Sequence, residues 1–413
     1  MIMRATRWCM AVMFWLVSAG CSGNRVASDA DDSVSVGSDE PVASDITSRI
    51  DHLADSVVAA MTLEQRVGQC FMPTVYASDD KETMLRLKRY MSDYHVGGIV
   101  LLKGNLRSAA EMIRVAAMAE IPLFVAIDAE WGLGMRLTDA PGFPRNGRLG
   151  DEADESLLFD YGAEVARECR RVGINMVLGP VVDVVENPNG VIGSRSFGSD
   201  PKRVADLGVA YARGLESGRV ISVAKHFPGH GSPAVDSHKS LPVISRSLHL
   251  LDSIDLYPFR SYIDAGLSGV MAGHLAVPAI DPQSLPAAVS SVVIGDLLRD
   301  DMGFSGLVLT DALNMGGVAG YHAADALKAG ADIVVAPADT GEEINRVLDM
   351  VENGELPIET IDDRCRRIIF HKYLVGAFEA DSISLHHLRE EVRSGADTLY
   401  NRLAGFSKQT KIH

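Results

Sequence analysis

The segment ISVAKHFPGHG at residues 221–231 sets the fold class, because it joins a short apolar run to a group of polar residues. Residues 221–224 have the length and composition of a strand that is buried on both faces. Lys225 and His226 follow at once, and a Pro-Gly pair at Pro228 then turns the chain. A buried strand that ends in charged side chains is typical of α/β enzymes, whose sites lie at the carboxyl ends of parallel strands.

Runs of the same kind recur along the chain, with amphipathic helical stretches between them. The other predicted strands are 98–102, 123–127, 175–178, 269–272, 307–310 and 333–336, and clear helical patterns cover 109–118, 155–170, 201–217 and 342–351. Repeated strand–helix units predict a parallel sheet covered by helices on both faces. Their number favours an α/β fold of the TIM-type (β/α)8 barrel, with a single catalytic domain. The alternative, an open doubly wound sheet, would carry a Gly-rich phosphate loop, and residues 103–105 lack that fingerprint.

Polar side chains follow four of these strands at the point where each strand ends. Asp128 follows the second predicted strand, Lys225 and His226 follow the fourth, His274 the fifth and Asp311 the sixth. One such residue alone would equally well cap the next helix. Together they predict one shared polar cleft at the carboxyl ends of the strands.

Three motifs resemble glycoside hydrolase family 3, and within that family the β-N-acetylhexosaminidase branch. They are KHFPGHG at 225–231 with DSH at 236–238, TDALNM at 310–315, and VIGSRSFG at 191–198. They stand in the order that the family has, and the resemblance covers residues 50–378. It implies a retaining exo-β-N-acetylhexosaminidase that removes terminal β-linked GlcNAc. We expect it to need neither a cofactor nor a metal.

The resemblance also assigns the catalytic groups. Asp311 corresponds to the nucleophile, a carboxylate that traps the sugar as a covalent glycosyl-enzyme. His238 corresponds to the acid/base, because this branch uses a histidine where most glycosidases use a second carboxylate; its side chain titrates near neutral pH. Asp236 is then expected to orient the His238 ring and to stabilise the imidazolium, as an aspartate does in a catalytic triad.

The same resemblance supplies the substrate-binding residues, whose donors and acceptors suit a hydroxyl-rich ligand. They are Asp128, Arg136, Arg195, Lys225, His226 and His274. Arg136 stands about three residues beyond the family's usual arginine, which leaves its contact with sugar open. His274 is equally consistent with the wall of the site and with a buried core histidine. Asp183 and His230 are expected to brace the barrel and the loop.

The amino-terminal region reads as a targeting segment. Residues 1–21 have basic residues before an uncharged stretch that is too short for a mature transmembrane helix. The stretch ends in SAGC, which resembles a bacterial lipobox with Cys21 as the lipidated residue. Residues 22–47 have the composition of a disordered acidic tether. The expected domains are therefore the 1–21 lipoprotein signal peptide, this tether, a 48–378 barrel and a 379–413 helical tail.

These segments place the protein in the bacterial cell envelope, lipid-anchored at the outer membrane or periplasmic face. Contact with a membrane is expected through the lipid only. The formal net charge of −16 argues against a nucleic-acid partner, and we expect a monomer. The cysteines Cys70, Cys169 and Cys365 have neither metal-ligand nor disulfide spacing, so they are expected to be buried and free.

Several alternatives stay open at this point. A binuclear metal site would use four histidines and Asp311, but Pro228 and Gly229 separate His226 from His230 and break the helix that usually presents such a pair. A β-glucosidase or a glycoside phosphorylase would share the fold. A glycan-binding lipoprotein without activity would share the cleft but would not need both Asp311 and the Asp236/His238 pair. For a hydrolase in the envelope, peptidoglycan fragments are the expected source of GlcNAc.

Overall fold

The computed structural model describes residues 40–150, 152–186, 190–231, 241–315, 318, 320–379 and 382–405. Its contacts divide the chain into two units, Met1–Asp45 and Ile46–His413. In the first unit only residues 40–45 are described, and they are helical. The sheet and the site lie in the second unit.

The centre of the second unit is a curled sheet of seven parallel strands that follow one another in chain order. The strands are β2 (Thr74–Ala77), β3 (Gly98–Gly104), β4 (Phe124–Ile127), β5 (Met176–Val177), β6 (Ile221–Phe227), β7 (Gly269–Ala272) and β8 (Leu307–Thr310). Every residue of β4, β7 and β8 is buried, as expected for a parallel sheet with helices outside and packed side chains inside. All seven strands therefore direct their carboxyl ends to the same edge.

A second, two-stranded parallel sheet joins β1 (Phe71–Met72) to β9 (Val334–Val335). The Met72 carbonyl accepts a hydrogen bond from the Ala336 amide at 3.0 Å, and the Pro73 carbonyl accepts one from the Val100 amide at 2.9 Å. The Thr310 amide donates to Ile333 at 3.0 Å. Residues on either side of Pro73 thus bond in opposite directions, towards β9 and towards β3.

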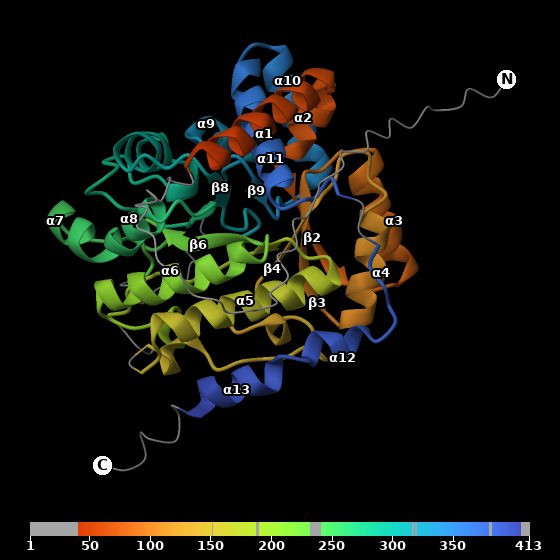
Figure 1. Ribbon diagram of the computed structural model, residues 1–413. Helices are drawn as coiled ribbons and strands as arrows, with labels where there is room; N and C mark the ends of the chain where they lie inside the picture. The colour runs from red at the N-terminus through yellow and green to blue at the C-terminus, as the bar shows by residue number, and fades with distance from the viewer. Residues whose placement is uncertain are drawn as a thin grey trace, which may run out of the picture. The chain divides into compact units, whose positions relative to one another are not determined.

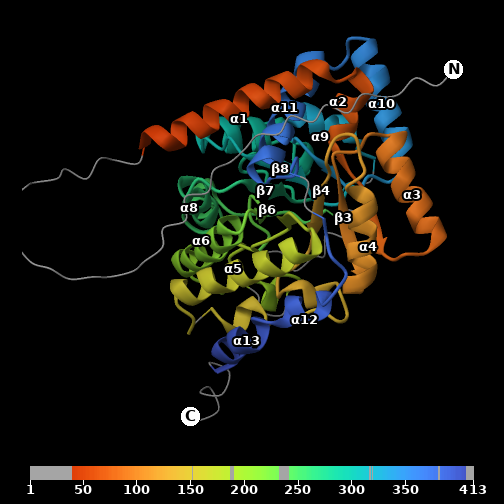
Figure 2. The same cartoon turned by 45° about the vertical axis from the view of Figure 1, so that its right-hand side comes forward.

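Helices follow the strands along the chain and surround the sheet (Figure 1). They are α3 (Lys81–Ser92), α4 (Leu106–Ala116), α5 (Glu155–Val172), α6 (Pro201–Ser217), α8 (Tyr257–Asp264), the π-helix η6 (Val292–Asp301), α9 (Ala323–Ala329), α10 (Thr340–Glu352) and α11 (Ile358–Leu374). Both views show α5 and α6 side by side (Figures 1 and 2). They approach closely because a Cβ on Gly162 would lie 2.0 Å from the Tyr211 carbonyl oxygen, and one on Gly214 would lie 2.2 Å from the Phe159 oxygen.

The sequence predicted most of these elements with small differences in their ends. The strands predicted at 269–272 and 307–310 are β7 and β8. The strand predicted at 221–224 continues to Phe227 as β6, so Lys225 and His226 belong to the strand itself. The strand residues 71–77 were not predicted, because Pro73 interrupts them and β2 alternates between buried and more exposed positions.

Two helix predictions need correction. The helix α1 spans Glu40–Ala60, so residues 40–47, which the sequence assigned to the tether, are helical. The 379–413 tail, which the sequence predicted as one helical segment, contains two helices, α12 (Leu388–Arg393) and α13 (Ala396–Gly405). A Cβ on Gly395, between them, would lie 2.5 Å from a Glu164 carboxylate oxygen, so a larger residue here would require the Glu164 side chain to shift.

The cap of one short helix and the described cysteines are also defined in the structure. Helix α2 (Leu63–Gln69) begins with a capping box, in which the Gln65 amide donates to the Thr62 hydroxyl and the Thr62 amide donates to the Gln65 side chain. Cys70, Cys169 and Cys365 are buried and free. Among the described helices, no stretch has the length and hydropathy that would be needed to cross a membrane.

Candidate active site

A buried network of opposite charges lies at the carboxyl ends of β4 and β6. Lys225, on β6, is 3% exposed, and its Nζ lies 2.9 Å from Asp128 Oδ1 and 2.8 Å from Glu130 Oε1. Asp128 and Glu130 follow β4 directly, so the parallel register brings the three side chains together. Arg136 forms a second ion pair with Asp128. The network spans strands that are about a hundred residues apart in the chain.

Arg195 adds a third cation to this network. It ends the 3-10 helix η3 (Gly193–Arg195) and binds Glu130 through two parallel hydrogen bonds, from Nε at 2.9 Å and from Nη2 at 2.8 Å. Bidentate pairs of this kind fix both the position and the plane of the guanidinium. The Glu130 side chain is only 1% exposed, and its carboxylate contacts both Arg195 and Lys225.

The pKa values of these groups reflect both their burial and their partners. Burial alone would raise the pKa of Asp128, but Lys225 and Arg136 hold it below its ordinary value. Burial would likewise raise the pKa of Glu130, and Lys225 and Arg195 lower it. Burial lowers the pKa of Lys225, yet Asp128 and Glu130 outweigh that effect and raise it. All of these groups are therefore charged at neutral pH.

A second buried group centres on Asp183, which is fully buried next to the end of β6. It accepts hydrogen bonds from the His226 amide at 3.1 Å and from the His230 amide at 2.6 Å, and His226 Nδ1 lies 2.8 Å from its other oxygen. Burial would raise the pKa of Asp183, but the adjacent His226 lowers it. This carboxylate holds the KHFPGHG turn in place, whereas the sequence predicted only that Asp183 would brace the barrel.

Asp311 and His274 stand at the ends of β8 and β7. The Ala312 amide donates to Asp311 Oδ1 at 2.8 Å, and the Asp311 amide donates to the Ala272 carbonyl at 2.8 Å. Burial would raise the pKa of Asp311, but His226, His274 and the Ala312 amide together hold it below its ordinary value. His274 is buried, and its Nε2 lies 2.9 Å from the Ala312 carbonyl oxygen. Asp311 is thus an ionised carboxylate with a fixed backbone.

The structure brings most of the predicted site residues to one edge of the sheet. The residues placed there are Asp128, Arg136, Arg195, Lys225, His226, His274 and Asp311. Asp236, His238 and Cys21 lie outside the described residues. Within the described residues, no group of three or more His, Cys, Asp and Glu side chains is arranged to hold a metal ion.

Sequence reasoning did not identify Glu130 as a site residue, although it is the most buried acid in the network. The available signal was its place two residues after Asp128 at a strand end. Arg136 was left open because of its displaced position, and the structure pairs it with Asp128. His230 supports its turn through its amide, as expected, while its ring nitrogens have no hydrogen-bond partner among the described residues.

A curled parallel sheet with ionised carboxylates, a buried lysine and histidines at its carboxyl edge defines the class of α/β enzymes that act at strand ends. Residues 62–370 match the model of the Glycosyl hydrolase family 3 N terminal domain. The chain therefore belongs to glycosyl hydrolase family 3 and is a glycoside hydrolase.

Relatives of known name agree with this assignment. The chain is 36% identical over 258 residues to a beta-hexosaminidase of Nitrosomonas eutropha, covering 58% of this chain and 73% of that protein. It is also similar to a family 3 beta-N-acetylglucosaminidase structure from a Paenibacillus species, with 30% identity and a TM-score of 0.74 over 84% of this chain and 69% of that one. A beta-N-acetylhexosaminidase structure from Beutenbergia cavernae gives 30% identity and a TM-score of 0.67, covering 75% of this chain and 98% of that one.

Proposed function

We propose that the chain is a retaining exo-β-N-acetylhexosaminidase that releases terminal β-linked GlcNAc. The observation that carries this proposal is the ionised, backbone-fixed carboxylate of Asp311, at a strand end beside the buried Lys225 network. The relatives named as hexosaminidases support the choice of sugar. A nucleophilic carboxylate must be charged at working pH, and the lowered pKa of Asp311 meets that need.

In the first step an Asp311 oxygen attacks the anomeric carbon, and the bond from that carbon to the glycosidic oxygen breaks. His238 donates its proton to the leaving oxygen. In the second step a water oxygen attacks the same carbon while His238 takes a proton from the water. The bond to Asp311 then breaks, and the carboxylate is regenerated. His238 has this role through the family resemblance, since its position lies outside the described residues.

The ion network retains hydrogen-bonding capacity for the sugar. An ammonium has three donors, and Lys225 uses two of them on Asp128 and Glu130. Arg195 binds Glu130 through Nε and Nη2, and its Nη1 has no partner among the described residues. Each Asp128 oxygen has a second lone pair for a sugar hydroxyl. We therefore propose that Asp128 accepts from hydroxyls while Lys225 and Arg195 donate to hydroxyl and acetamido oxygens, with Arg136, His226 and His274 completing the pocket.

We propose further that the curled sheet is a complete eight-stranded barrel. Residues 71–77 can be treated as one strand, because the Met72 carbonyl bonds to the Ala336 amide after β9 and the Pro73 carbonyl bonds to the Val100 amide on β3. Such a strand would join the two sheets. The bridge between Leu309 and Ile333 joins β8 to the β9 side. In a closed barrel Asp128 and Asp311 face one enclosed pocket rather than the two ends of an open sheet.

A direct test measures hydrolysis of p-nitrophenyl β-N-acetylglucosaminide and of the matching β-glucoside. We expect turnover of the first only, with a first product that retains the β configuration by NMR. With Asp311→Ala, added azide should restore release from an activated substrate and give an α-glycosyl azide, because azide then replaces the missing nucleophile. A preference for the glucoside would refute the sugar assignment, and formation of GlcNAc-1-phosphate in phosphate buffer would indicate a phosphorylase. Folded protein that is inactive on both substrates would favour a glycan-binding role.

We also propose that the natural substrates are peptidoglycan fragments and that Cys21 anchors the protein to the cell envelope. The SAGC motif and the acidic segment after it support the anchor. Mass spectrometry of muropeptides after incubation with the enzyme should show loss of terminal GlcNAc from muramic acid. Membrane fractionation should find the wild type in the envelope fraction and Cys21→Ser in the soluble periplasmic fraction. Identical distribution of the two would contradict the anchor but not the activity.

A further inference from the structure

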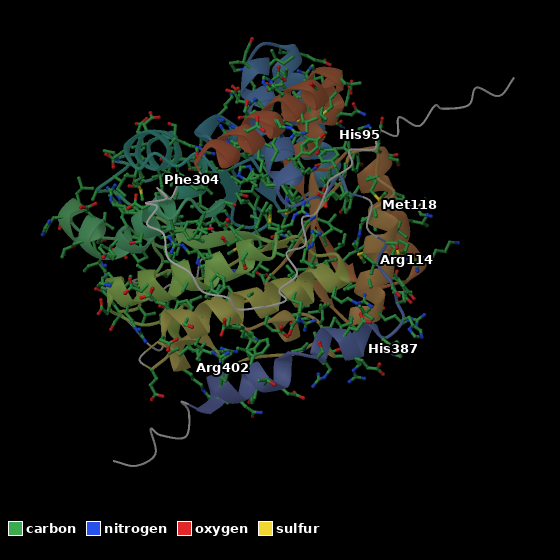
Figure 3. The ribbon with its side chains drawn as sticks, viewed as in Figure 1. His95, Arg114, Met118, Phe304, His387 and Arg402 are labelled. Carbon is green, nitrogen blue, oxygen red and sulfur yellow. The ribbon has the colours of Figure 1, made fainter. Side chains whose placement is uncertain are left out.

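A cavity of about 360 Å³ lies at the amino ends of the strands, away from the candidate active site. Its walls come from η6, from the carboxyl end of α9 and from α11. Asp332, just before β9, and Gly306, just before β8, mark this end of the sheet. Phe304, labelled in Figure 3, lies near it, with its ring centre 5.4 Å from the Arg299 guanidinium carbon.

The cavity collects positive charge in a protein that is acidic as a whole. Four cationic side chains line it, and Asp296 is the one acid among the described lining residues. The cations are Arg299, Arg364, Arg367 and Lys328. Behind them lies one more carboxylate, Asp332, which is fully buried. The group therefore holds two more positive than negative charges, although the chain has a formal net charge of −16.

Asp332 cannot neutralise all three arginines. Its Oδ2 accepts from Arg299 Nη2 at 2.7 Å and from the Val308 amide at 2.7 Å. Its Oδ1 is engaged by Arg367 Nη1, and Arg364 Nε lies 3.9 Å from the same oxygen, beyond hydrogen-bond range. Arg364 Nε is buried and has no acceptor among the described residues. Asp332 therefore leaves excess positive charge on the cavity wall, which a bound anion would balance.

The opposite wall provides further donors and room. Lys328 is exposed at the end of α9, and within the described part of the chain it makes no hydrogen bond or ion pair. Ser291, at the start of η6, places a hydroxyl on the rim. A Cβ added to Gly295 would meet no heavy atom within 4 Å, so the wall leaves space beside the cations.

We propose that this cavity binds a compact tetrahedral oxyanion, either free phosphate or sulfate or the phosphoryl group of a phosphomonoester. The planar guanidinium of Arg364 suits two oxygens of such a group, and Lys328 supplies a point charge from the other side. The bound anion links α9 to α11, and binding should therefore stabilise the folded state in proportion to its occupancy. The proposal is independent of the reaction at Asp311.

The experiment is a titration of the full chain with sodium phosphate, sodium sulfate and glycerol phosphate, against sodium chloride at matched ionic strength. Thermal unfolding and isothermal calorimetry are the readouts. We expect a saturable rise in Tm with phosphate and sulfate that chloride does not give. A rise with glycerol phosphate as well would identify a site that accepts esters, whereas inorganic anions alone would identify a site for the free ion. A rise that never saturates, or equal rises with chloride, would refute the proposal.

Arg364→Met should weaken phosphate binding by about tenfold or more, because it removes a charge-assisted contact. Lys328→Met should weaken it in the same direction, and it cannot perturb the core because this side chain is exposed. The matched control is Arg107→Met, which removes one exposed positive charge on α4 far from the cavity and should leave binding unchanged. Saturating GlcNAc should not compete with phosphate. Unchanged binding in both cavity variants, or competition by GlcNAc, would overturn the assignment.

Discussion

Replacing Lys372 by methionine should stabilise the protein, and the gain should depend on pH. Lys372 lies on α11, is fully buried, and donates a hydrogen bond to Gln69 Oε1. Its ammonium also lies 5.4 Å from the centre of the Phe124 ring. Burial lowers the pKa of Lys372 to about 7 from an ordinary value of 10.5. Methionine keeps the length of the apolar stem without the charge.

The size of the expected gain in stability follows from the pKa values of Lys372 in the unfolded and the folded chain. Lowering the pKa from 10.5 to about 7 costs the folded state about 5 kcal/mol relative to a side chain that never ionises. Losing the hydrogen bond to Gln69 offsets about 1–3 kcal/mol of this. Below pH 7, Lys372→Met should therefore raise the free energy of unfolding by about 2–4 kcal/mol.

Because folding lowers the pKa of Lys372, the free energy of unfolding of the wild type should rise with pH. Between pH 7 and pH 10 the unfolded chain binds a proton at Lys372 that the folded chain does not, so wild-type stability from this group rises with pH. The slope is about 1.4 kcal/mol per pH unit. Stability from this group is lost as the pH falls from about 10 to 7, and the loss levels off below pH 7, where the folded chain also binds the proton. The advantage of Lys372→Met should thus shrink by about 2–3 kcal/mol between pH 7 and pH 9.

The assay is urea unfolding of the wild type and of Lys372→Met at pH 6, 7, 8 and 9. The free energy of unfolding of the wild type is then subtracted from that of the variant at each pH. Taking the difference cancels other groups that titrate in this range. Lys88→Met, an exposed lysine on α3, is the matched control and should show little change at any pH. A flat difference between Lys372→Met and wild type would refute the reasoning, because it would mean that folding leaves the pKa of Lys372 unchanged.

Three further changes test the site and the network behind the cavity. Asp311→Asn should lower kcat at least about 10³-fold with an unchanged Tm, while Asp339→Asn, at an exposed helix cap, should keep full activity. Glu130→Gln should raise KM by about 10-fold or more, because Arg195 and Lys225 lose the carboxylate that orients them; a change in kcat alone would contradict this reading. Asp332→Asn should lower the free energy of unfolding by about 3–5 kcal/mol in urea, since it leaves buried arginines unpaired, and a loss below 1 kcal/mol would refute that role.

The sequence predicted the strands and the strand-end residues well where one physical pattern dominates. A strand buried on both faces, such as β8, is a continuous apolar run, and the first polar residue after it marks the carboxyl edge. That is why the amino-acid pattern alone places Asp128 and Asp311 at one edge of the sheet. The strand across Pro73 was missed because proline and a half-exposed alternation are weak strand signals.

The pairing of charges could not be predicted in the same way. Glu130 meets Arg195 across 65 positions of the chain, and Lys372 meets Gln69 across 303. No local periodicity encodes such contacts, since they depend on which strands become neighbours and on how far each loop extends. The break between α12 and α13 was missed for a related reason: Gly395, at this break, lies against the carboxylate of Glu164, a residue on another helix.

The ion network fixes the positions of the cations in a site that is rich in charge. Each cation that we assign to the sugar already has a carboxylate partner, so none needs to move or lose water when substrate arrives. Glu130 sits behind Lys225 and Arg195 at 1% exposure, so it supports them without facing the sugar. Donors held in advance can stabilise developing charge without reorganisation during the reaction. Asp311 is also held in advance, because its amide donates to Ala272 on the neighbouring strand and the Ala312 amide donates to its carboxylate.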